Sequence, residues 1–158
     1  MNHLLFIPVY NCEKQIPRVL KKIVESECFT YFNEILIIDN ISNDNTVNVA
    51  KKVINELNNN KFSIFQNKSN YNLGGTHKVA FNYAIEKKYD YVSILHGDDQ
   101  GDINDLKKIF KEKSYVNYDC ILGSRFSKKS KLINYPKFRI YANYLINLAA
   151  SIVTLKFL

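Results

Sequence analysis

Short apolar runs alternate along this chain with segments whose apolar residues recur at every third or fourth position. Runs rich in β-branched and aromatic residues predict five strands, at Leu4–Val9, Glu34–Ile38, Phe62–Phe65, Tyr91–Leu95 and Tyr118–Leu122. The first run is apolar throughout, which is typical of a parallel strand covered on both faces. Strands that alternate with helices predict an α/β fold with a mainly parallel sheet and right-handed crossovers.

Segments with helical spacing lie between the predicted strands, starting near Ile16, Asp44, Gly74 and Ile103. Pro17 lies near the start of the first helix, where a missing N–H costs little. The side chain of Asp44 is expected to cap the second helix. The spacing therefore predicts a helix after each of the first four strands.

Polar residues gather where the predicted strands end. Pro8, Tyr10 and Asn11 end the first run, and further clusters lie at residues 39–44, 72–78, 96–102 and 124–125. In a parallel α/β sheet, ligands bind beyond the carboxyl ends of the strands. The placement of these clusters predicts an active-site rim along that edge.

The cluster at residues 96–102 combines Asp98, Asp99 and Asp102 with His96 and Gln100. Neighbouring carboxylates repel each other and are costly to bury, so water or a cation usually compensates them. Oxygen ligands suit Mg2+ or Mn2+, which bind well when a substrate diphosphate completes the coordination shell. The alternative is a polar turn in which Asp102 caps the helix that follows.

The chain has 158 residues, of which 46% are hydrophobic and 23% are charged, and its formal net charge is +7. This composition suits one domain with a substantial core and argues against disorder. The positive charge suggests an anionic partner, but the basic residues are spread along the chain, so nucleic acid is not expected. Cys12, Cys28 and Cys120 lack zinc-ligand spacing and are expected to be reduced thiols in a cytoplasmic protein.

The ends of the chain show no clean membrane signal. Leu4–Val9 is too short for a signal peptide, and Asn143, Asn147 and Lys156 interrupt the apolar segment Ile140–Leu158. We expect this segment to form an amphipathic helix that packs on the domain, on a partner or on a bilayer surface. The predicted location is the cytoplasm, with the cytoplasmic face of the membrane as a peripheral site.

Five sequence motifs follow one another along the chain, and their order is specific to one family: IPVYNCE at residues 7–13, IIDNISNDNT at 37–46, NLGGTHKVAFNYA at 72–84, HGDDQGD at 96–102 and GSRF at 123–126. Together they resemble the GT-A glycosyltransferases of the inverting family 2, which includes dolichyl-phosphate mannose synthases and undecaprenyl-phosphate sugar transferases. The resemblance extends from residue 4 to about residue 145. It implies a GT-A, Rossmann-like domain for nucleotide sugars over residues 1–126. It also implies that a basic loop and an amphipathic helix over residues 127–158 begin an acceptor or membrane-proximal region.

The chemistry of the motif residues agrees with this resemblance. Tyr10 could stack on a nucleobase, and Asp39 could accept a base N–H or precede a helix as a cap. Gly75 would let the backbone approach a diphosphate, and Lys78 would either neutralise it or remain a solvated helix lysine. The nucleotide-sugar-binding residues predicted in this way are Pro8, Tyr10, Asn11, Glu13, Asp39, Asn40, Ser42, Gly75, Lys78, His96 and Gly97.

The resemblance also implies the metal and catalytic residues. It assigns Asp98 and Gln100 to a divalent Mn2+ or Mg2+ that stabilises the departing nucleoside diphosphate. His96 stands where the family has the first Asp of its DxD motif; a histidine could still ligate Mn2+, or it could equally be a neutral hydrogen-bond donor to a metal ligand. Arg125 would face the transferred group or an acceptor phosphate. Asp98 and Arg125 are therefore the predicted catalytic residues, and the neighbouring Asp99 is expected to point to solvent.

The sequence departs from the family pattern in two further places. Asn40 and Ile41 replace Asp and Gly of the second motif, so the base contacts are expected to differ. The chain ends at Leu158, short of the residues that close the acceptor site in the family, which predicts a fold truncated on that side.

The leading hypothesis is a metal-dependent glycosyltransferase that moves a sugar from a UDP- or GDP-linked donor to a polyprenyl phosphate or glycan, with inversion. A catalytically incomplete or degenerate domain that still binds nucleotide sugars is the main alternative. A sugar nucleotidyltransferase would need a glycine-rich loop after the first strand, and Pro8–Lys14 has no glycine. A generic dinucleotide-binding fold would need GxGxxG there. The sugar, the acceptor and the oligomeric state remain open, although the apolar C-terminal helix is a natural contact surface.

Overall fold

The structure, a computed structural model, describes residues 1–124 and 136–155 of the chain. The chain divides into two units, residues 1–119 and residues 120–158. The domain boundary predicted at residues 126–127 falls outside the described residues and stays a prediction.

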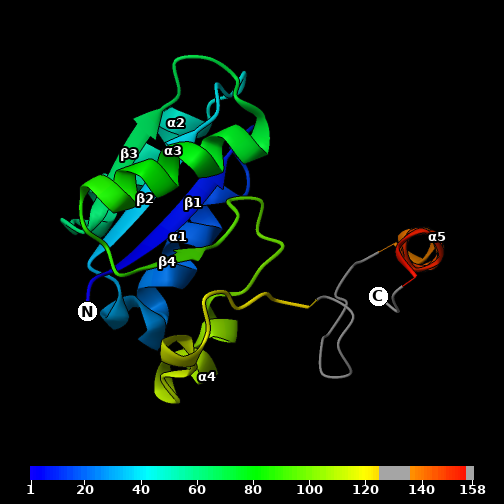
Figure 1. Ribbon diagram of the computed structural model, residues 1–158. Helices are drawn as coiled ribbons and strands as arrows, with labels where there is room; N and C mark the ends of the chain where they lie inside the picture. The colour runs from blue at the N-terminus through cyan, green and yellow to red at the C-terminus, as the bar shows by residue number, and fades with distance from the viewer. Residues whose placement is uncertain (125–135, 156–158) are drawn as a thin grey trace. The chain divides into compact units, whose positions relative to one another are not determined.

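The first unit alternates strands and helices (Figure 1). Its elements are β1 (His3–Val9), α1 (Ile16–Glu25), β2 (Glu34–Asp39), α2 (Thr46–Leu57), β3 (Phe62–Gln66), α3 (Asn72–Glu86), β4 (Tyr91–Ile94) and α4 (Leu106–Lys111), with short 3-10 helices η1 (Glu27–Tyr31), η2 (Ile103–Asp105) and η3 (Ser114–Asn117). All the strand pairs are parallel, in the order β3-β2-β1-β4. The predicted parallel α/β sheet is thus confirmed.

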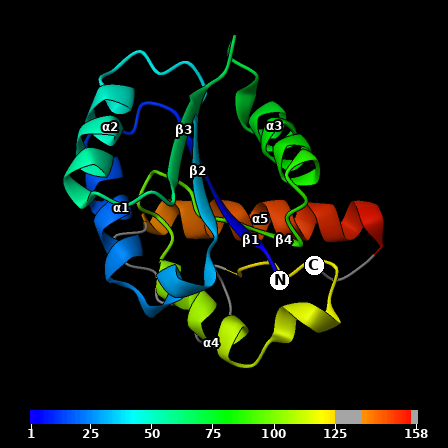
Figure 2. The ribbon, with the colours of Figure 1, turned by 90° about the vertical axis from the view of Figure 1, so that its left-hand side faces the viewer.

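Helices cover both faces of this sheet (Figure 2). On one face, Ala80 and Ala84 of α3 pack against Leu4 and Phe6 of β1. On the other face, the apolar side of α1, which includes Leu20, belongs to the larger core cluster together with α2 and the inward side chains of β1 and β2. Because β1 and β2 are buried on both faces, residues 4–9 and 35–38 are continuously apolar rather than alternating.

The helices begin close to where their signals predict. Ile16, Val19, Leu20 and Ile23 are the buried residues of α1, as their spacing predicts. Asp44 lies two residues before α2 and accepts the N–H of its first residue, Thr46, at 3.0 Å. Asp102 accepts the N–H of Asn104 at 2.9 Å and thereby caps η2 rather than a regular α-helix.

Two expectations about strands are wrong. Residues 118–124 form no strand, and Tyr118 and Leu122 are 65% and 85% exposed. An apolar run becomes a strand only when it gains ladder hydrogen bonds, and this run pairs with no described strand. Pro8 does not end β1 either: the pairing with β4 stops at Phe6, so the N–H that proline lacks is not needed there.

The second unit contains α5 (Lys137–Thr154), which corresponds to the predicted C-terminal helix. Across residues 1–124 and 136–155, none of the helices combines the length and the apolar character needed to cross a bilayer.

Candidate functional site

The carboxyl ends of the parallel strands lie along one edge of the sheet (Figure 1). Val9, Asp39, Gln66 and Ile94 end β1, β2, β3 and β4. The polar clusters at residues 10–11, 39–44, 72–78 and 96–102 therefore meet there, as the sequence predicts. Because parallel α/β sheets bind ligands beyond these ends, this edge is the candidate site.

Asn11 ties the loop after β1 to the loop after β2. Its N–H donates to Ser42 Oγ at 2.9 Å, and its Oδ1 accepts the N–H of Asn43 at 2.8 Å. Its φ of 53° lies in the left-handed region, which asparagine tolerates better than most residues. The side chain of Asn11 therefore shapes the loop, and its predicted contact with a nucleotide stays a prediction.

The carboxylates of Glu13 and Asp44 strengthen the same connection, because each accepts a backbone N–H from the other loop. Glu13 accepts the N–H of Asn45 at 3.1 Å, and Asp44 accepts the N–H of Glu13 at 3.1 Å. Thr46 Oγ1 accepts the N–H of Cys12 at 2.8 Å. Burial alone would raise the pKa of Asp44, but hydrogen bonds from Thr46 and Glu13 outweigh it and lower that pKa. The first two loops thus form a preorganised wall of the site.

Two tyrosines are exposed beside this wall. Tyr10 begins the loop after β1 and is 45% exposed, and Tyr71 precedes α3 and is 40% exposed. An exposed aromatic ring next to backbone that is held in place can stack on a nucleobase. The stacking role of Tyr10 stays a prediction. Tyr71 was missed, although it directly precedes the NLGG motif.

Asp39 is fully buried at the end of β2. Its carboxylate accepts the hydroxyl of Ser42, the N–H of Ser42 at 3.1 Å and Nε2 of Gln66 at 2.8 Å. The hydroxyl of Ser42 therefore donates to the carboxylate of Asp39 and accepts the N–H of Asn11, and its predicted contact with a nucleotide sugar stays a prediction. A base N–H that reached Asp39 would have to displace or join these donors, and Gln66 is a site residue that the sequence analysis missed.

Asn40 is the centre of a buried amide network. Its Oδ1 accepts Asn67 Nδ2 at 2.9 Å and the N–H of Tyr71 at 2.9 Å, and its Nδ2 donates to Asn70 at 2.7 Å. Asn67 also donates to Thr76 of α3 at 3.0 Å. This network joins the end of β2 to the loop that leads into α3. Asn40 was predicted as a site residue, whereas Asn67 and Asn70 were missed, although the polar run after β3 was a signal that could have revealed them.

Pro8 and Gly97 are packing residues of this edge. Pro8 is buried, and its carbonyl accepts the N–H of Gly97 at 3.1 Å. A Cβ on Gly97 would lie 2.4 Å from Cγ1 of Val9, so only glycine fits without a shift. Both residues position the turn after β4, and their predicted contacts with a nucleotide sugar stay predictions.

The turn after β4 carries the predicted metal ligands. Asp98 Oδ1 accepts the N–H of Gln100 at 3.1 Å, and His96 is exposed. The ring of His96 lies 6.1 Å from that of His77 on α3, measured between centroids. Nδ1 of His77 lies 2.7 Å from the carbonyl of Leu73. His77 is thus a further rim residue that the sequence analysis did not single out.

The resemblance implies a metal ion at this turn. In the described part of the chain, no three His, Cys, Asp or Glu side chains gather as a metal-binding group. Mg2+ and Mn2+ are commonly held by one or two carboxylates together with substrate phosphates. The carboxylate of Asp98 thus fits an ion whose coordination shell a diphosphate completes.

Asp99 does not point to solvent as expected. It has a φ of 62°, and its carboxylate bonds Arg18 Nε at 2.9 Å and Lys22 Nζ at 2.8 Å. Burial alone would raise the pKa of Asp99, but the bonds from Lys22 and Arg18 outweigh it and lower that pKa. The left-handed backbone turns Asp99 toward α1, away from a role with its neighbour Asp98.

The start of α3 contains the remaining predicted contacts. A Cβ on Gly75 would lie 2.6 Å from Cβ of Tyr71, so the close approach that requires glycine is to this tyrosine. Lys78 is exposed and has no carboxylate partner among residues 1–124 and 136–155. Arg125 lies outside the described residues.

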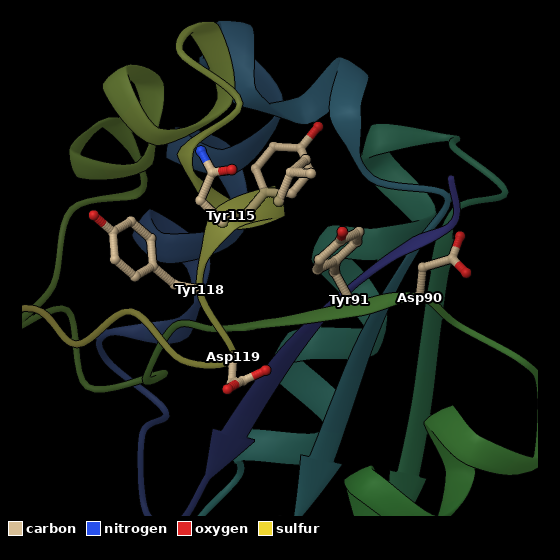
Figure 3. Close-up of a pocket in the computed structure, with 7 residues that line it drawn as sticks. Asp90, Tyr91, Tyr115, Tyr118 and Asp119 are labelled. Atoms are coloured by element: carbon tan, nitrogen blue, oxygen red, sulfur yellow. The ribbon is translucent and has the colours of Figure 1, made fainter.

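A pocket of about 510 Å³ lies elsewhere in the first unit (Figure 3). Asp90, Tyr91 and residues 115–119 line it. The rings of Tyr91 and Tyr115 meet edge to face with centroids 4.8 Å apart. Since Tyr91 begins β4, this pocket lies at the opposite end of the strand from His96 and contains none of the predicted site residues.

The model of the glycosyl transferase family 2 matches residues 5–154. The chain belongs to this family. It is 30% identical over 139 residues to the uncharacterized glycosyltransferase MG060 of Mycoplasma genitalium, covering 85% of this chain and 46% of that protein. It is 27% identical over 143 residues to the protein MJ1222 of Methanocaldococcus jannaschii, covering 89% of this chain and 54% of that protein. The chain therefore spans about half the length of these relatives.

Solved structures share the fold of this chain. S. aureus TarS 1–349 in complex with UDP-GlcNAc superimposes with a TM-score of 0.57 at 23% identity, covering 83% of this chain and 37% of that one. A second structure of S. aureus TarS gives a TM-score of 0.59 at 24% identity, covering 87% of this chain and 23% of that one. These likenesses confirm the predicted GT-A architecture.

Proposed function

We propose that this chain forms the donor-binding part of a glycosyltransferase that uses a UDP-linked sugar such as UDP-GlcNAc. Membership of family 2 supports the reaction class, and the complex of TarS with UDP-GlcNAc supports the donor class. The observation that carries the proposal is the edge of the sheet. There the linked loops after β1 and β2 carry the exposed Tyr10, and the turn that holds Asp98 is joined to β1 by the bond from the N–H of Gly97 to the carbonyl of Pro8.

Different residues of this edge would bind the base, the diphosphate and the metal ion of the donor complex. Tyr10 stacks on the base, and Lys78, which has no carboxylate partner in the described residues, contacts the diphosphate. Asp98, with Gln100 and His96, holds a divalent ion of the Mn2+ or Mg2+ type. When bound, this ion neutralises the negative charge of the departing diphosphate.

The proposed transfer is a single in-line displacement with inversion at the anomeric carbon. The acceptor is a polyprenyl phosphate, whose oxygen is already ionised at neutral pH and needs no general base. Arg125 would bind this phosphate or the transferred group as a bidentate cation. The alternative is a catalytically incomplete or degenerate domain, which would bind the donor without turnover.

Calorimetric titration of UDP and of GDP, each with and without Mn2+, tests the donor site. We expect UDP to bind in a metal-dependent manner. We expect Asp98→Asn to weaken this binding at least about 10-fold, since it removes the charge of a metal ligand. Asp105→Asn is the matched control, because Asp105 is an exposed carboxylate outside the site.

Three results would count against the proposal. If a folded chain binds neither nucleotide, the edge is not a donor site. If UDP binding ignores both Mn2+ and Asp98→Asn, the ion is not held at this turn. Preference for GDP would overturn the UDP assignment alone.

A further inference from the structure

The turn after β4 places a second carboxylate directly after the proposed metal ligand Asp98. Asp99 has a φ of 62°, a left-handed conformation that most residues avoid and that aspartate tolerates better than most. Its side chain is only 13% exposed. A carboxylate withdrawn from water beside another one needs a cationic partner, because burial and the neighbouring negative charge both disfavour its charged form.

Two basic residues of α1 supply this charge. Arg18 and Lys22 are four positions apart, so they lie on the same side of the helix. Nε of Arg18 donates to one oxygen of Asp99 at 2.9 Å, and Nζ of Lys22 donates to the other oxygen at 2.8 Å. With both of its oxygens bonded, Asp99 is not available to ligate an ion, but it ties the turn to a regular helix.

Arg18 also bonds the loop after β1. Its Nη1 donates to the carbonyl of Lys14 at 2.7 Å. Lys14 directly follows Glu13, whose N–H and carboxylate both bond the loop after β2. A single guanidinium therefore joins the two loops beside the proposed nucleotide site to the turn that carries the proposed metal ligand. Arginine suits this position, since its planar group holds several donors in a fixed arrangement.

Asp98 thus lies between two fixed points of the turn. On one side, the N–H of Gly97 donates to the carbonyl of Pro8 on β1 at 3.1 Å. On the other side, the carboxylate of Asp99 bonds α1. A turn that samples several conformations binds an ion only in its competent fraction, whereas a turn fixed on both sides avoids this loss of affinity.

We propose that Arg18, Lys22 and Asp99 form a clamp that positions Asp98 for the metal ion and couples metal binding to nucleotide binding. All three are positioning residues, and none of them contacts the ion or the donor. This inference rests on the proposed function, because the ion and the nucleotide define the two sites that the clamp connects. Coupling between two sites is reciprocal, so loss of the clamp reduces the gain in affinity that each ligand gives to the other.

Calorimetric titration of Mn2+ with and without UDP tests the clamp. We expect Arg18→Gln to weaken Mn2+ binding to the UDP complex about 10-fold, since residues that orient a metal ligand contribute on this scale. Lys22→Gln removes one exposed ion pair and should weaken this binding about 3-fold. Arg18→Lys keeps the charge but lacks the planar group, so it should recover only part of the affinity. Lys21→Gln is the matched control, because Lys21 is an exposed lysine of the same helix.

Two further measurements separate positioning from a purely structural role. Arg18 and Lys22 are 57% and 51% exposed, so each variant should keep the melting temperature of the wild type within about 5 °C. Hydrogen exchange follows the turn without any ligand. The amides of residues 97–100 should exchange at least about 3-fold faster in Arg18→Gln with Lys22→Gln than in Lys21→Gln, because the turn opens more often.

Four results would overturn the clamp. The first is a wild type that binds Mn2+ and UDP while Arg18→Gln and Lys22→Gln match Lys21→Gln, which leaves the donor site intact. The second is unchanged hydrogen exchange of the turn. The third is UDP binding by Arg18→Gln that weakens equally with and without Mn2+, since Arg18 then shapes the nucleotide loop and couples nothing. The fourth is a folded wild type that binds neither ligand, which removes the donor site and the clamp together.

Discussion

Asn40→Ala separates a structural role from a ligand role at the donor edge. The family resemblance implies that Asn40 contacts the nucleotide, yet its side chain is only 7% exposed and makes three hydrogen bonds. Alanine would remove the acceptor of the Tyr71 N–H and of Asn67 Nδ2, and it would remove the donor to Asn70 Oδ1, which keeps its bond from the N–H of Asn72. Asn67 would keep its bond to Thr76.

The expected cost follows from these three bonds. A hydrogen bond contributes a net 0.5–1.5 kcal/mol, so the loss of three lowers the free energy of unfolding by about 3 kcal/mol. For a unit of this size, that corresponds to a fall in melting temperature of about 10 °C. Asn40→Asp keeps two acceptor bonds but turns the third into an oxygen–oxygen contact with Asn70, so we expect an intermediate loss.

Thermal unfolding and UDP titration of the same samples check this reasoning. Asn43→Ala is the control, because Asn43 is exposed and uses only its backbone N–H toward Asn11. We expect Asn40→Ala to lower the melting temperature while UDP affinity, measured where the variant is folded, changes less than about 3-fold. A variant with unchanged melting temperature and strongly weakened UDP binding would show that Asn40 contacts the nucleotide and would refute the structural assignment.

Three further predictions concern packing and titration. Gly97→Ala should lower the free energy of unfolding in urea by about 1–3 kcal/mol, because the new methyl group meets Val9. Gly74→Ala has open space around it and should be neutral or stabilise the protein by up to about 1 kcal/mol. Equal effects of the two substitutions would contradict the packing argument. Burial and a hydrogen bond to the carboxylate of Glu34 raise the pKa of Tyr83 to about 12. The wild type should therefore exceed Tyr83→Phe in free energy of unfolding below about pH 10, and this difference should shrink between about pH 10 and pH 12. A difference in unfolding free energy that does not change with pH would refute the role of this hydrogen bond. Asp99→Asn should lower the free energy of unfolding by about 1 kcal/mol at neutral pH. Because the pKa of Asp99 is depressed in the folded state, the difference in stability between wild type and variant should fade as the pH drops below about 4. A difference that persists in acid would refute the ion-pair account.

Local patterns were sufficient for much of the fold. The apolar runs of β1 and β2 and the three-four spacing in α1 identify the elements, because burial on both faces or on one stripe leaves a periodic signature. The same runs located the polar clusters at strand ends, and hence the donor edge. Their order also revealed the family, which the match over residues 5–154 confirms.

The contacts between segments were decided by the tertiary structure. Tyr118–Leu122 has the composition of a strand but finds no partner among the described strands. The carboxylate of Asp99 bonds Arg18 and Lys22 of α1, which lie about eighty positions away in the chain. Gly97 is required by the position of Val9 on a neighbouring strand. A sequence carries propensities and periodicities, whereas hydrogen bonding and packing between distant segments depend on which surfaces the fold brings together.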